Sequence, residues 1–569
     1  MALPVRHWAS ALTTTDDAVT GASSDGVLYP TFDDDALAEL AGFGQRRPIA
    51  SGEVLFEPGE DLPNFLVILE GEVELVRVDE AGEALIATFT PGQFVGGIGL
   101  LTGQRTYLTA RAKRSGWILE IDRSEFRRLM SSRPALADII FGAIVARREF
   151  LVAGEAARAV RIIGSRYSPE AMALRSFATR ARLAYTWIDL DDADDVDAVL
   201  ASMGLRPMDT PVVVTPTAVL RHPSPMDLAA EFGLTYQPVP GRVFDLVIVG
   251  TGPAGLSASV YGASEGLDTV CLDAVGPGGQ AGTSSRIENY AGFPSGISGG
   301  ELTARIAIQA QRLGALLASP NKAIALRIEQ GFHVVVLADE SEIACRAVMV
   351  ATGARYRRLA VDDLDRFEGA GVYYAATELE ARICSGGDVI VVGGGNSAGQ
   401  AALFLAQLGS RVSIVIRRSS LAAHMSRYLI DRVEVDPRIK ILTDTEVRAL
   451  GGGAHLERVT LEHTPTGRHR TVSCSGLFCF IGAEAATGWL GGTVALDSAG
   501  FVLTDRSIPK AALVDPLFSA RDPLPLETSA PGVFAVGDVR LGSTKRVAAA
   551  VGEGSSAVRS VYEHLDALR

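Results

Sequence analysis

Short apolar stretches separated by turn residues dominate the chain from about residue 30 to residue 122. Phe65–Leu69 and Glu72–Val76 are typical of strands, with Glu70-Gly71 as a turn between them. The further turn signals are Pro58-Gly59, Ala81-Gly82 and Pro91-Gly92. This pattern predicts a small all-β barrel or jelly roll. A loose polar arm over residues 1 to about 30 is expected before it, and a helical pattern over about 123–158 follows it.

The next stretch, from residue 159 to about 240, alternates between strand and helix patterns. The predicted strands are Val160–Ile163, Ala184–Ile188 and Pro211–Val214, and the predicted helices are Pro169–Arg182, Val196–Met203 and Pro225–Phe232. Alternation of this kind is typical of a small α/β domain. The Pro-rich segment 238–241 is expected to be a linker.

From Arg242 onward the chain contains a strand, a glycine turn and a helix, and the same unit recurs at Asp388. Two copies this far apart indicate a duplicated domain. The sequence therefore predicts a multidomain α/β protein with an N-terminal β jelly roll, a small α/β domain and two Rossmann-like domains. The expected segments are 30–158, 159–240, 242–357, 358–478 and 479–569.

Length and composition restrict the function classes. The 569 residues agree with three to five domains at roughly 150 residues each. A net charge of −14 disfavours nucleic acid as a partner, because no surplus of cations is present to neutralise phosphates. No apolar run approaches the roughly 18 residues of a membrane span. The five cysteines are few and odd in number, and the first residues lack a signal-peptide pattern, so a cytoplasmic location is expected.

The first glycine turn follows the apolar strand Val247-Ile248-Val249. Its glycines would permit a tight turn, close approach of a pyrophosphate and close packing of the next helix. An acid follows the next strand, where it can accept hydrogen bonds from ribose hydroxyls. The predicted dinucleotide-binding residues here are Gly250, Gly252, Pro253, Ala254, Gly255 and Asp273.

The second glycine turn follows Val389–Val392, and its next strand ends in Arg417-Arg418 rather than in an acid. Adjacent cations suit a 2′-phosphate, so NADPH is favoured over NADH. The alternative for this pair is a solvated basic turn. The predicted binding residues are Gly393, Gly395, Asn396, Ser397, Ala398, Arg417 and Arg418.

Several further motifs accompany the two turns: Gly278-Gly279-Gln280, Ile287–Phe293, Ala351-Thr352-Gly353, and Gly537-Asp538 with Arg546-Val547-Ala548. Together with the turns, they make residues 242–569 resemble the low-molecular-weight thioredoxin reductase branch of the pyridine-nucleotide disulfide oxidoreductases. The resemblance implies two nested Rossmann-like domains: segments 242–357 and 479–569 form one that binds FAD, and 358–478, inserted between them, forms one that binds NADPH. It also implies a homodimer. By this resemblance the additional FAD contacts are Gly279, Gln280, Asn289, Thr352, Gly353, Gly537, Asp538, Arg546, Val547 and Ala548.

One part of the family pattern is missing. Ala375 and Glu378 stand where the family carries its redox-active Cys-x-x-Cys. A thiol–disulfide relay needs a nucleophilic thiolate and a resolving thiol, so thioredoxin reduction by the family mechanism is disfavoured. Of the remaining cysteines, most are expected to be structural. Cys384, the nearest in sequence to the altered motif, has the alternative of a single flavin-facing thiol.

The two N-terminal blocks carry weaker resemblances. Residues 30 to 150 resemble the cyclic-nucleotide-binding domain, with a phosphate cassette from Phe94 to Arg105 in which Gly97 replaces the family's ribose-binding Glu. Both a nucleotide pocket and a purely structural barrel remain open. Residues 159 to 236 resemble a thioredoxin- or glutaredoxin-like domain, with Thr210-Pro211 at the family's cis-proline position. Its active-site position, Ser165–Glu170, has no cysteine.

These observations favour an NADPH-dependent flavoprotein that passes electrons from FAD to an acceptor other than a protein disulfide. The open acceptors are a ferredoxin, a flavodoxin, a quinone, oxygen or another small molecule. No side chain is predicted to act as a catalytic acid, base or nucleophile, and no metal site is expected. The alternatives are a ligand-responsive redox sensor or scaffold in which the barrel binds a nucleotide, and a thioredoxin-disulfide reductase that uses other cysteines.

Overall fold

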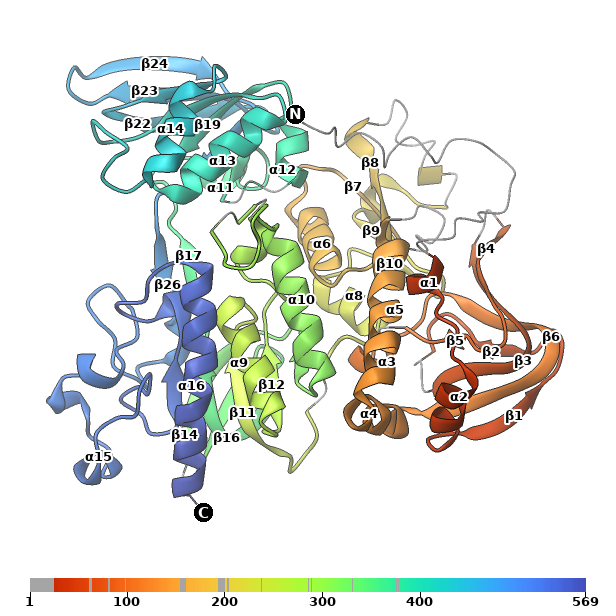
Figure 1. Ribbon diagram of the computed structural model, residues 1–569. Helices are drawn as coiled ribbons and strands as arrows, with labels where there is room; N and C mark the ends of the chain where they lie inside the picture. Colours follow the sequence, from red (N-terminus) through yellow and green to blue (C-terminus); the bar gives the residue numbers. More distant parts are fainter. Residues whose placement is uncertain are drawn as a thin grey trace.

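The structure is a computed structural model that describes residues 25–568, apart from 61–63, 80–81, 98, 154–159, 193–199, 202–203, 237, 285, 288, 330, 375 and 377. Most of the predicted N-terminal arm and most of the predicted helix Val196–Met203 therefore lie outside the described residues. Figure 1 shows the barrel and the small α/β block on one side of the molecule and the two Rossmann-like blocks on the other.

The N-terminal block is an antiparallel sheet in the order β1-β6-β3-β4, with β2 on β6 and β5 on β3. Its strands are β1 (Gln45–Ile49), β2 (Val54–Phe56), β3 (Asn64–Asp79), β4 (Gly82–Phe89), β5 (Phe94–Val95) and β6 (Thr109–Asp122), and its short helices are α1 (Asp25–Leu28), α2 (Asp34–Ala41) and α3 (Gly99–Thr102). The rings of Phe94 and Phe126 pack on that of Phe65, with centroids 4.8 and 5.0 Å apart. The predicted all-β barrel is confirmed.

The predicted turn at Glu70-Gly71 is wrong, because β3 runs continuously through it. Gly71 has φ +93°, and a Cβ there would lie 2.7 Å from the carbonyl oxygen of Arg114 on β6. The pairing of β3 with β6 shifts register at this point. The glycine therefore bends one long strand by a bulge instead of reversing the chain.

The helical pattern predicted over about 123–158 is confirmed as far as residue 153, beyond which the next residues lie outside the described part of the chain. It consists of two helices, α4 (Arg123–Ser132) and α5 (Pro134–Ala153), which meet at an angle of 118°. Pro134 cannot donate a backbone hydrogen bond to the preceding turn, but it suits the first position of a new helix. Within the described residues no single helix is long and apolar enough to cross a membrane. Among the described helices, only α4 and α5 taken together, bent as they are, would meet that requirement, by length and composition alone.

The small α/β block has a four-stranded sheet in the order β10-β9-β7-β8. Its elements are β7 (Val160–Gly164), α6 (Pro169–Arg180), β8 (Tyr185–Asp189), β9 (Val212–Val214), β10 (Val219–Arg221) and α8 (Pro225–Glu231). β8 is parallel to β7, whereas β9 is antiparallel to it. The predicted strands and the helices α6 and α8 are confirmed, and the Thr210-Pro211 bond is cis, as predicted. Strand β10 was not predicted.

The first Rossmann-like block is a seven-stranded sheet in the order β13-β12-β11-β16-β15-β14, with β27 on β16. Its strands are β11 (Val243–Val249), β12 (Thr269–Leu272), β13 (Leu316–Ala318), β14 (Ala323–Glu329), β15 (Phe332–Leu337), β16 (Glu342–Val350) and β27 (Val533–Ala535), and its helices are α9 (Pro253–Ser264), α10 (Gly299–Arg312), α15 (Leu517–Ala520) and α16 (Val547–Ala567). Val247 and Ile248 of β11 belong to different apolar clusters, so both faces of the sheet are buried, as is typical of parallel sheets.

The second Rossmann-like block has a parallel sheet in the order β18-β25-β19-β20-β21 and a three-stranded antiparallel sheet. The parallel strands are β18 (Val372–Tyr373), β19 (Asp388–Val392), β20 (Arg411–Val415), β21 (Ile439–Leu442) and β25 (Gly476–Cys479). The antiparallel strands are β22 (Thr445–Gly452), β23 (Leu456–His463) and β24 (Arg468–Ser473), and the helices are α11 (Leu364–Phe367), α12 (Glu378–Ile383), α13 (Asn396–Gln407) and α14 (Arg427–Val435).

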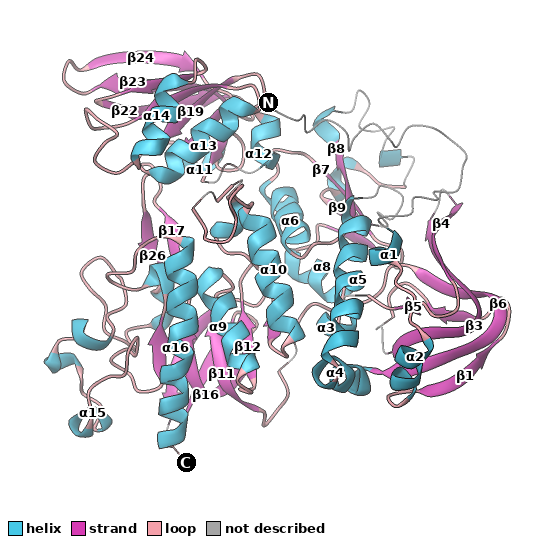
Figure 2. Ribbon diagram, in the orientation of Figure 1, coloured by secondary structure: helices cyan, strands magenta, loops and turns pink. Residues whose placement is uncertain are grey.

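Two antiparallel strands, β17 (Ala354–Tyr356) and β26 (Ala483–Ala485), connect the Rossmann-like blocks. Figure 2 shows this pair crossing between the two blocks, with helix α10 facing the N-terminal side of the molecule. On that side an ion pair of 2.7 Å joins Arg312 of α10 to Asp138 of α5. The N-terminal blocks thus rest on the first Rossmann-like block through α10.

Two histidines lie buried where α16 covers the first Rossmann-like sheet. His333 and His564 flank Gly532, and a Cβ on that glycine would lie 2.9 and 2.5 Å from their Nε2 atoms. Burial, with the neighbouring His564, lowers the pKa of His333 to about 4. Burial likewise lowers the pKa of His564, against the opposing effect of Glu527.

We expect acid to destabilise this region through His333. The unfolded chain takes up the proton near pH 6.5 and the folded chain only near pH 4, so stability present above pH 6.5 is lost as the pH falls toward 4. The loss should approach about 3 kcal/mol. Thermal unfolding midpoints measured between pH 7 and pH 4.5 should fall less in His333→Asn than in the wild type. An identical fall in both proteins would contradict the assignment.

Candidate functional site

The first glycine turn lies between the end of β11 and the start of α9. Gly250 has φ +112°, and a Cβ there would lie 2.3 Å from the carbonyl oxygen of Ala351. A Cβ on Gly255 would lie 1.8 Å from the carbonyl oxygen of Gly250. These two glycines are therefore required by the packing of the chain itself, as the sequence predicted.

Gly252 is required for a different reason. It has φ −70° and ψ −179°, which any residue adopts, and the nearest atom to its would-be Cβ is the Cα of Gly279 at 3.9 Å. A side chain at 252 would fit the protein but would fill the space at the N-terminus of α9, beside Pro253. The helix dipole and the free backbone N–H groups favour an anion in that space. This cradle fits the pyrophosphate of a dinucleotide.

Asp273 lies at the end of β12, as predicted, and holds the turn together. Its carboxylate accepts hydrogen bonds from the backbone N–H groups of Thr251 at 2.9 Å, Val275 at 2.9 Å and Gly276 at 3.0 Å. The sequence did not reveal this structural role. The predicted contact with ribose hydroxyls remains a prediction, for which carboxylate lone pairs remain available.

Three further segments meet at this turn. Gln280 donates a side-chain hydrogen bond to the carbonyl oxygen of Ala354, and the Thr352 hydroxyl donates to Ala486 at 2.8 Å, next to Gly353 with φ +65°. A Cβ on Gly537 would lie 3.0 Å from the Cβ of Ala254, so the segment with Asp538 packs on the start of α9. Burial raises the pKa of Asp538, while Lys545 opposes this.

The remaining predicted FAD residues lie at the start of α16 and in the segment around residue 289. Val547 packs against the apolar cluster that contains Ile287 and Ile297, so this cluster joins the two segments. The side chains of Asn289 and Arg546 are exposed, as is Ala548. The structure therefore brings together on one block all residues that the sequence predicted for the first dinucleotide.

The second glycine turn repeats the geometry of the first. Gly393 has φ +137°, and a Cβ there would lie 2.3 Å from the carbonyl oxygen of Phe480. Gly395 has φ −98° and no atom within 4 Å of its would-be Cβ. Ala398 is fully buried and Ser397 is exposed. A second pyrophosphate-sized cradle thus lies at the N-terminus of α13.

Asn396 has a structural partner that the sequence did not reveal. Its Nδ2 donates to the Ser426 hydroxyl at 3.0 Å, and its Oδ1 accepts from the Ser426 backbone N–H at 2.7 Å. Ser426 precedes α14, so Asn396 fixes that helix relative to the glycine turn. Its predicted contact with NADPH remains a prediction.

Arg417 and Arg418 are exposed directly after β20. Neither side chain has an ion pair or hydrogen bond to any residue that the structure describes. By contrast, Arg411 at the other end of the same strand pairs with Asp388 at 2.7 Å. Two unpaired guanidinium groups at this strand end are available to a phosphate.

All five cysteines are free and buried. Burial raises the pKa to about 12 for Cys271, Cys384, Cys474 and Cys479, and it also raises the pKa of Cys345. Cys384 is 1% exposed, and its thiol donates to the carbonyl oxygen of Ser475 at 3.4 Å, so it does not face open space. Thiols of this kind are poor nucleophiles.

The segment at the family's Cys-x-x-Cys position is only partly described. Ala375 lies outside the described residues, and Glu378 is the first residue of α12. Just before it, Tyr373 is buried and its ring packs on Phe478 at 5.3 Å. Tyr373 is thus a core aromatic residue.

The phosphate-cassette segment of the barrel, Phe94 to Arg105, contacts the small α/β block through Arg105. The Arg105 backbone N–H donates to Phe232 at 2.9 Å, and its side chain donates to the carbonyl oxygen of Glu231 at 3.4 Å, at the end of α8. Tyr107 packs edge-on against Phe232 at 6.4 Å. The cavity inside the barrel measures about 120 Å³, with Gly97 on its wall.

The loop Ser165–Glu170 of the small α/β block, which has no cysteine, contacts the second Rossmann-like block. Tyr167 stacks on His455 of the second Rossmann-like block, with ring centroids 5.0 Å apart. Arg166 pairs with Asp189 at 2.7 Å within its own block. The loop therefore acts as a contact between blocks. Among the residues that the structure describes, no three His, Cys, Asp or Glu side chains are grouped to hold a metal.

Two sheets whose central strands are parallel, each with a glycine cradle at a helix N-terminus, define a protein that binds two dinucleotides. Residues 244–554 match the family model described as "Pyridine nucleotide-disulphide oxidoreductase". The chain belongs to this family and is an NAD(P)H-dependent flavoprotein enzyme with FAD and NADPH as cofactors. Residues 46–133 match the model of the cyclic nucleotide-binding domain, which confirms the resemblance of the N-terminal block.

Individual relatives agree with this assignment. The thioredoxin reductase of Treponema pallidum is 31% identical over 326 residues, which are 57% of this chain and 98% of that protein. The "34.2 kDa protein in rubredoxin operon" of Clostridium pasteurianum is 29% identical over 57% of this chain and 98% of its own length. The crystal structure of T. acidophilum thioredoxin reductase superposes with a TM-score of 0.51 at 27% identity, covering 58% of this chain and all of that one (100%).

The two cradles allow a matched pair of substitutions. Because Ala fits the protein at both positions, we expect the FAD-free forms of Gly252→Ala and Gly395→Ala to have unfolding free energies within about 0.5 kcal/mol of the FAD-free wild type. Gly252→Ala should purify with little FAD, whereas Gly395→Ala should keep FAD and weaken NADPH binding at least tenfold. The flavin-to-protein absorbance ratio and NADPH titrations measure both. Normal FAD content in Gly252→Ala would contradict the cradle.

Proposed function

We propose that the enzyme takes a hydride from NADPH onto FAD and passes the electrons to an acceptor that is not a protein disulfide. The observation that carries this proposal is the burial of all five thiols, each with a raised pKa. The sequence also has no cysteine at 375 or 378. A disulfide relay would need a reactive thiolate that the chain does not offer.

The roles of the residues follow from their positions. Gly250–Gly255, Gln280, Thr352 and Asp538 would hold FAD, and Gly393–Ala398 with Arg417 and Arg418 would hold NADPH. The isoalloxazine supplies the redox chemistry, accepting two electrons and releasing them singly or in pairs. The chain itself positions the two cofactors and surrounds Asp538 with low dielectric, where Lys545 helps to keep it charged.

The acceptor is proposed as a class. A ferredoxin, a flavodoxin, a quinone, oxygen or another small molecule can each take electrons from a flavin without a thiol. The relative encoded in a rubredoxin operon supports a small electron-transfer protein among these. A homodimer and a cytoplasmic location are proposed with this function, as the family resemblance and the cysteine content suggest.

A second candidate function is a redox sensor whose N-terminal block binds a ligand. The match of residues 46–133 to the cyclic nucleotide-binding domain favours it. A sensor would bind FAD but turn over negligibly with NADPH and an artificial acceptor, whereas an enzyme should reach roughly 1–10³ per second.

The electron capacity of the protein tests the proposed function directly. Anaerobic dithionite titration, followed by flavin absorbance, should consume about two electrons per FAD, because no thiol pair takes part. Uptake of about four electrons would reveal a hidden dithiol and would restore the disulfide-reductase alternative, with Cys384, Cys474 and Cys479 as the suspects.

The choice of nicotinamide cofactor tests the two arginines. Replacing both Arg417 and Arg418 with Ala should raise the KM for NADPH at least about 100-fold, since each charged contact to a phosphate contributes about 1.5–3 kcal/mol when well formed. The KM for NADH and both kcat values should change little. Arg411→Ala, on the same strand but paired with Asp388, is the matched control. An unchanged KM for NADPH would make the pair a solvated basic turn.

A further inference from the structure

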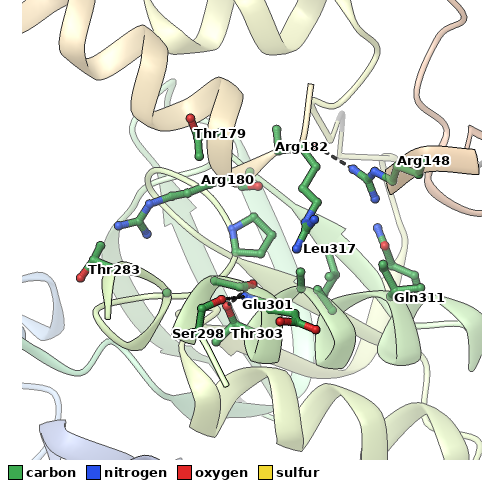
Figure 3. A pocket seen from close by; sticks show the side chains of 18 of the residues that line it. Arg148, Thr179, Arg180, Arg182, Thr283, Ser298, Glu301, Thr303, Gln311 and Leu317 are labelled. Atoms are coloured by element: carbon green, nitrogen blue, oxygen red, sulfur yellow. Dashed lines mark hydrogen bonds between the residues drawn. The ribbon is translucent and has the colours of Figure 1, made fainter. Parts of the chain in front are cut away.

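A further cavity lies away from both glycine cradles. It measures about 510 Å³ and lies where the barrel, the small α/β block and the first Rossmann-like block meet, with α13 of the second block at its edge. Figure 3 shows residues of α6 and of the chain after it on one side and residues of α10 on the other. We call it the seam cavity. Its volume is in the range of small-molecule sites.

Three arginines line the seam cavity: Arg148 of α5, Arg180 of α6 and Arg182 just after α6. Arg148 donates to the carbonyl oxygen of Ala181 at 2.7 Å, and Arg180 reaches that of Gly276 at 3.5 Å. The Arg182 side chain has no hydrogen bond or ion pair to any residue within the described parts of the chain. Burial lowers the pKa of Arg148 to about 10, and the neighbouring positive charge of Arg182 contributes to this shift.

Among the residues that the structure describes, Arg148 and Arg182 face little opposing charge. Glu301 is the acid that lines the cavity, and its Oε1 accepts a hydrogen bond from Arg305 at 2.5 Å. Asp138, near the other end of α10, pairs with Arg312. Arg148 and Arg182 are partly buried, so the two neighbouring charges repel each other, and an anion placed between them offsets that repulsion.

The rest of the lining is suited to an organic body. Ala304, Ala307, Ile308 and Leu317 give an apolar floor, while Ser298 and Thr303 add hydroxyl groups. Gln104 is 5% exposed, lines this cavity, and its Oε1 has no hydrogen-bond partner among the described residues. A buried amide oxygen without a hydrogen-bond partner in the protein is expected to accept a hydrogen bond from a bound molecule.

The cavity inside the barrel is a poorer place for such a ligand. At about 120 Å³ it is small for a nucleotide, Gly97 offers no acceptor for a ribose hydroxyl, and Arg105 is engaged at the end of α8. The two cavities share three lining residues: Gln104, Arg148 and Arg182.

We propose that the seam cavity binds a nucleotide-sized organic phosphate, with Arg148 and Arg182 on its phosphate and the apolar floor of α10 under its body. Because two adjacent guanidinium groups favour a dianion, a phosphate monoester should bind better than a cyclic phosphodiester. Gly282, Thr283 and Ser284 form part of the wall directly after Gln280. The ligand would therefore touch the loop that leads into the FAD cradle.

The test uses the full chain loaded with FAD and calorimetric titration with AMP, cyclic AMP and inorganic pyrophosphate. We expect AMP to bind, more weakly at high salt, and more tightly than cyclic AMP. Arg182→Ala, which removes no side-chain hydrogen bond or ion pair within the described residues, should weaken AMP binding at least tenfold, and Arg182→Lys should restore part of it. Arg221→Ala, on the same block but away from the cavity, is the matched control.

Three outcomes would overturn the proposal. The first is no binding of any of the three probes at millimolar concentration. The second is equal AMP affinity in the wild type and in Arg182→Ala, which would place AMP in one of the glycine cradles instead. The third is that cyclic AMP binds more tightly than AMP and that its affinity does not depend on Arg182, which would place the nucleotide site in the barrel cavity instead. Thermal midpoints of the free variants show whether each one is folded.

Discussion

The pairing of β27 with β16 is the contact on which the C-terminal half of the molecule depends. The two strands are parallel, with Val348 opposite Val533, yet the whole second Rossmann-like block lies between them in the chain. The first sheet is therefore complete only after the chain has left through β17 and returned through β26. Long-range parallel pairing of this kind carries a loop-closure cost that the β17–β26 pair reduces by holding the two ends of the insertion together.

Much of this arrangement could be predicted from the sequence, because its strongest signals are local. The glycine turns follow buried strands, and the positions of Gly250 and Gly393 are fixed by contacts with the backbone immediately beside them. The prediction that was wrong involves competition between local and long-range effects: Glu70-Gly71 has turn chemistry, but pairing with β6 keeps β3 continuous. The predicted helical pattern after the barrel is present, and Pro134 divides it by starting a second helix.

The features that the sequence did not reveal all depend on partners distant in the chain. Asp273 holds the backbone of the first turn, and Asn396 holds the start of α14. Arg105 carries the signature of a phosphate site but is occupied by α8. The seam cavity could not be predicted, because its arginines come from separate elements that meet only when the blocks pack together. A motif identifies the residues able to bind, whereas packing decides which of them are free to do so.

Burial of the thiols also affects the chemical durability of the protein. Cysteine oxidation begins at an accessible thiolate, and none of the five side chains here provides one at neutral pH. A peroxide molecule in solution therefore meets no exposed sulfhydryl group on this chain. Oxidative inactivation should then begin at other groups, such as methionine side chains. The packing that buries the five thiols thus also protects them from oxidation.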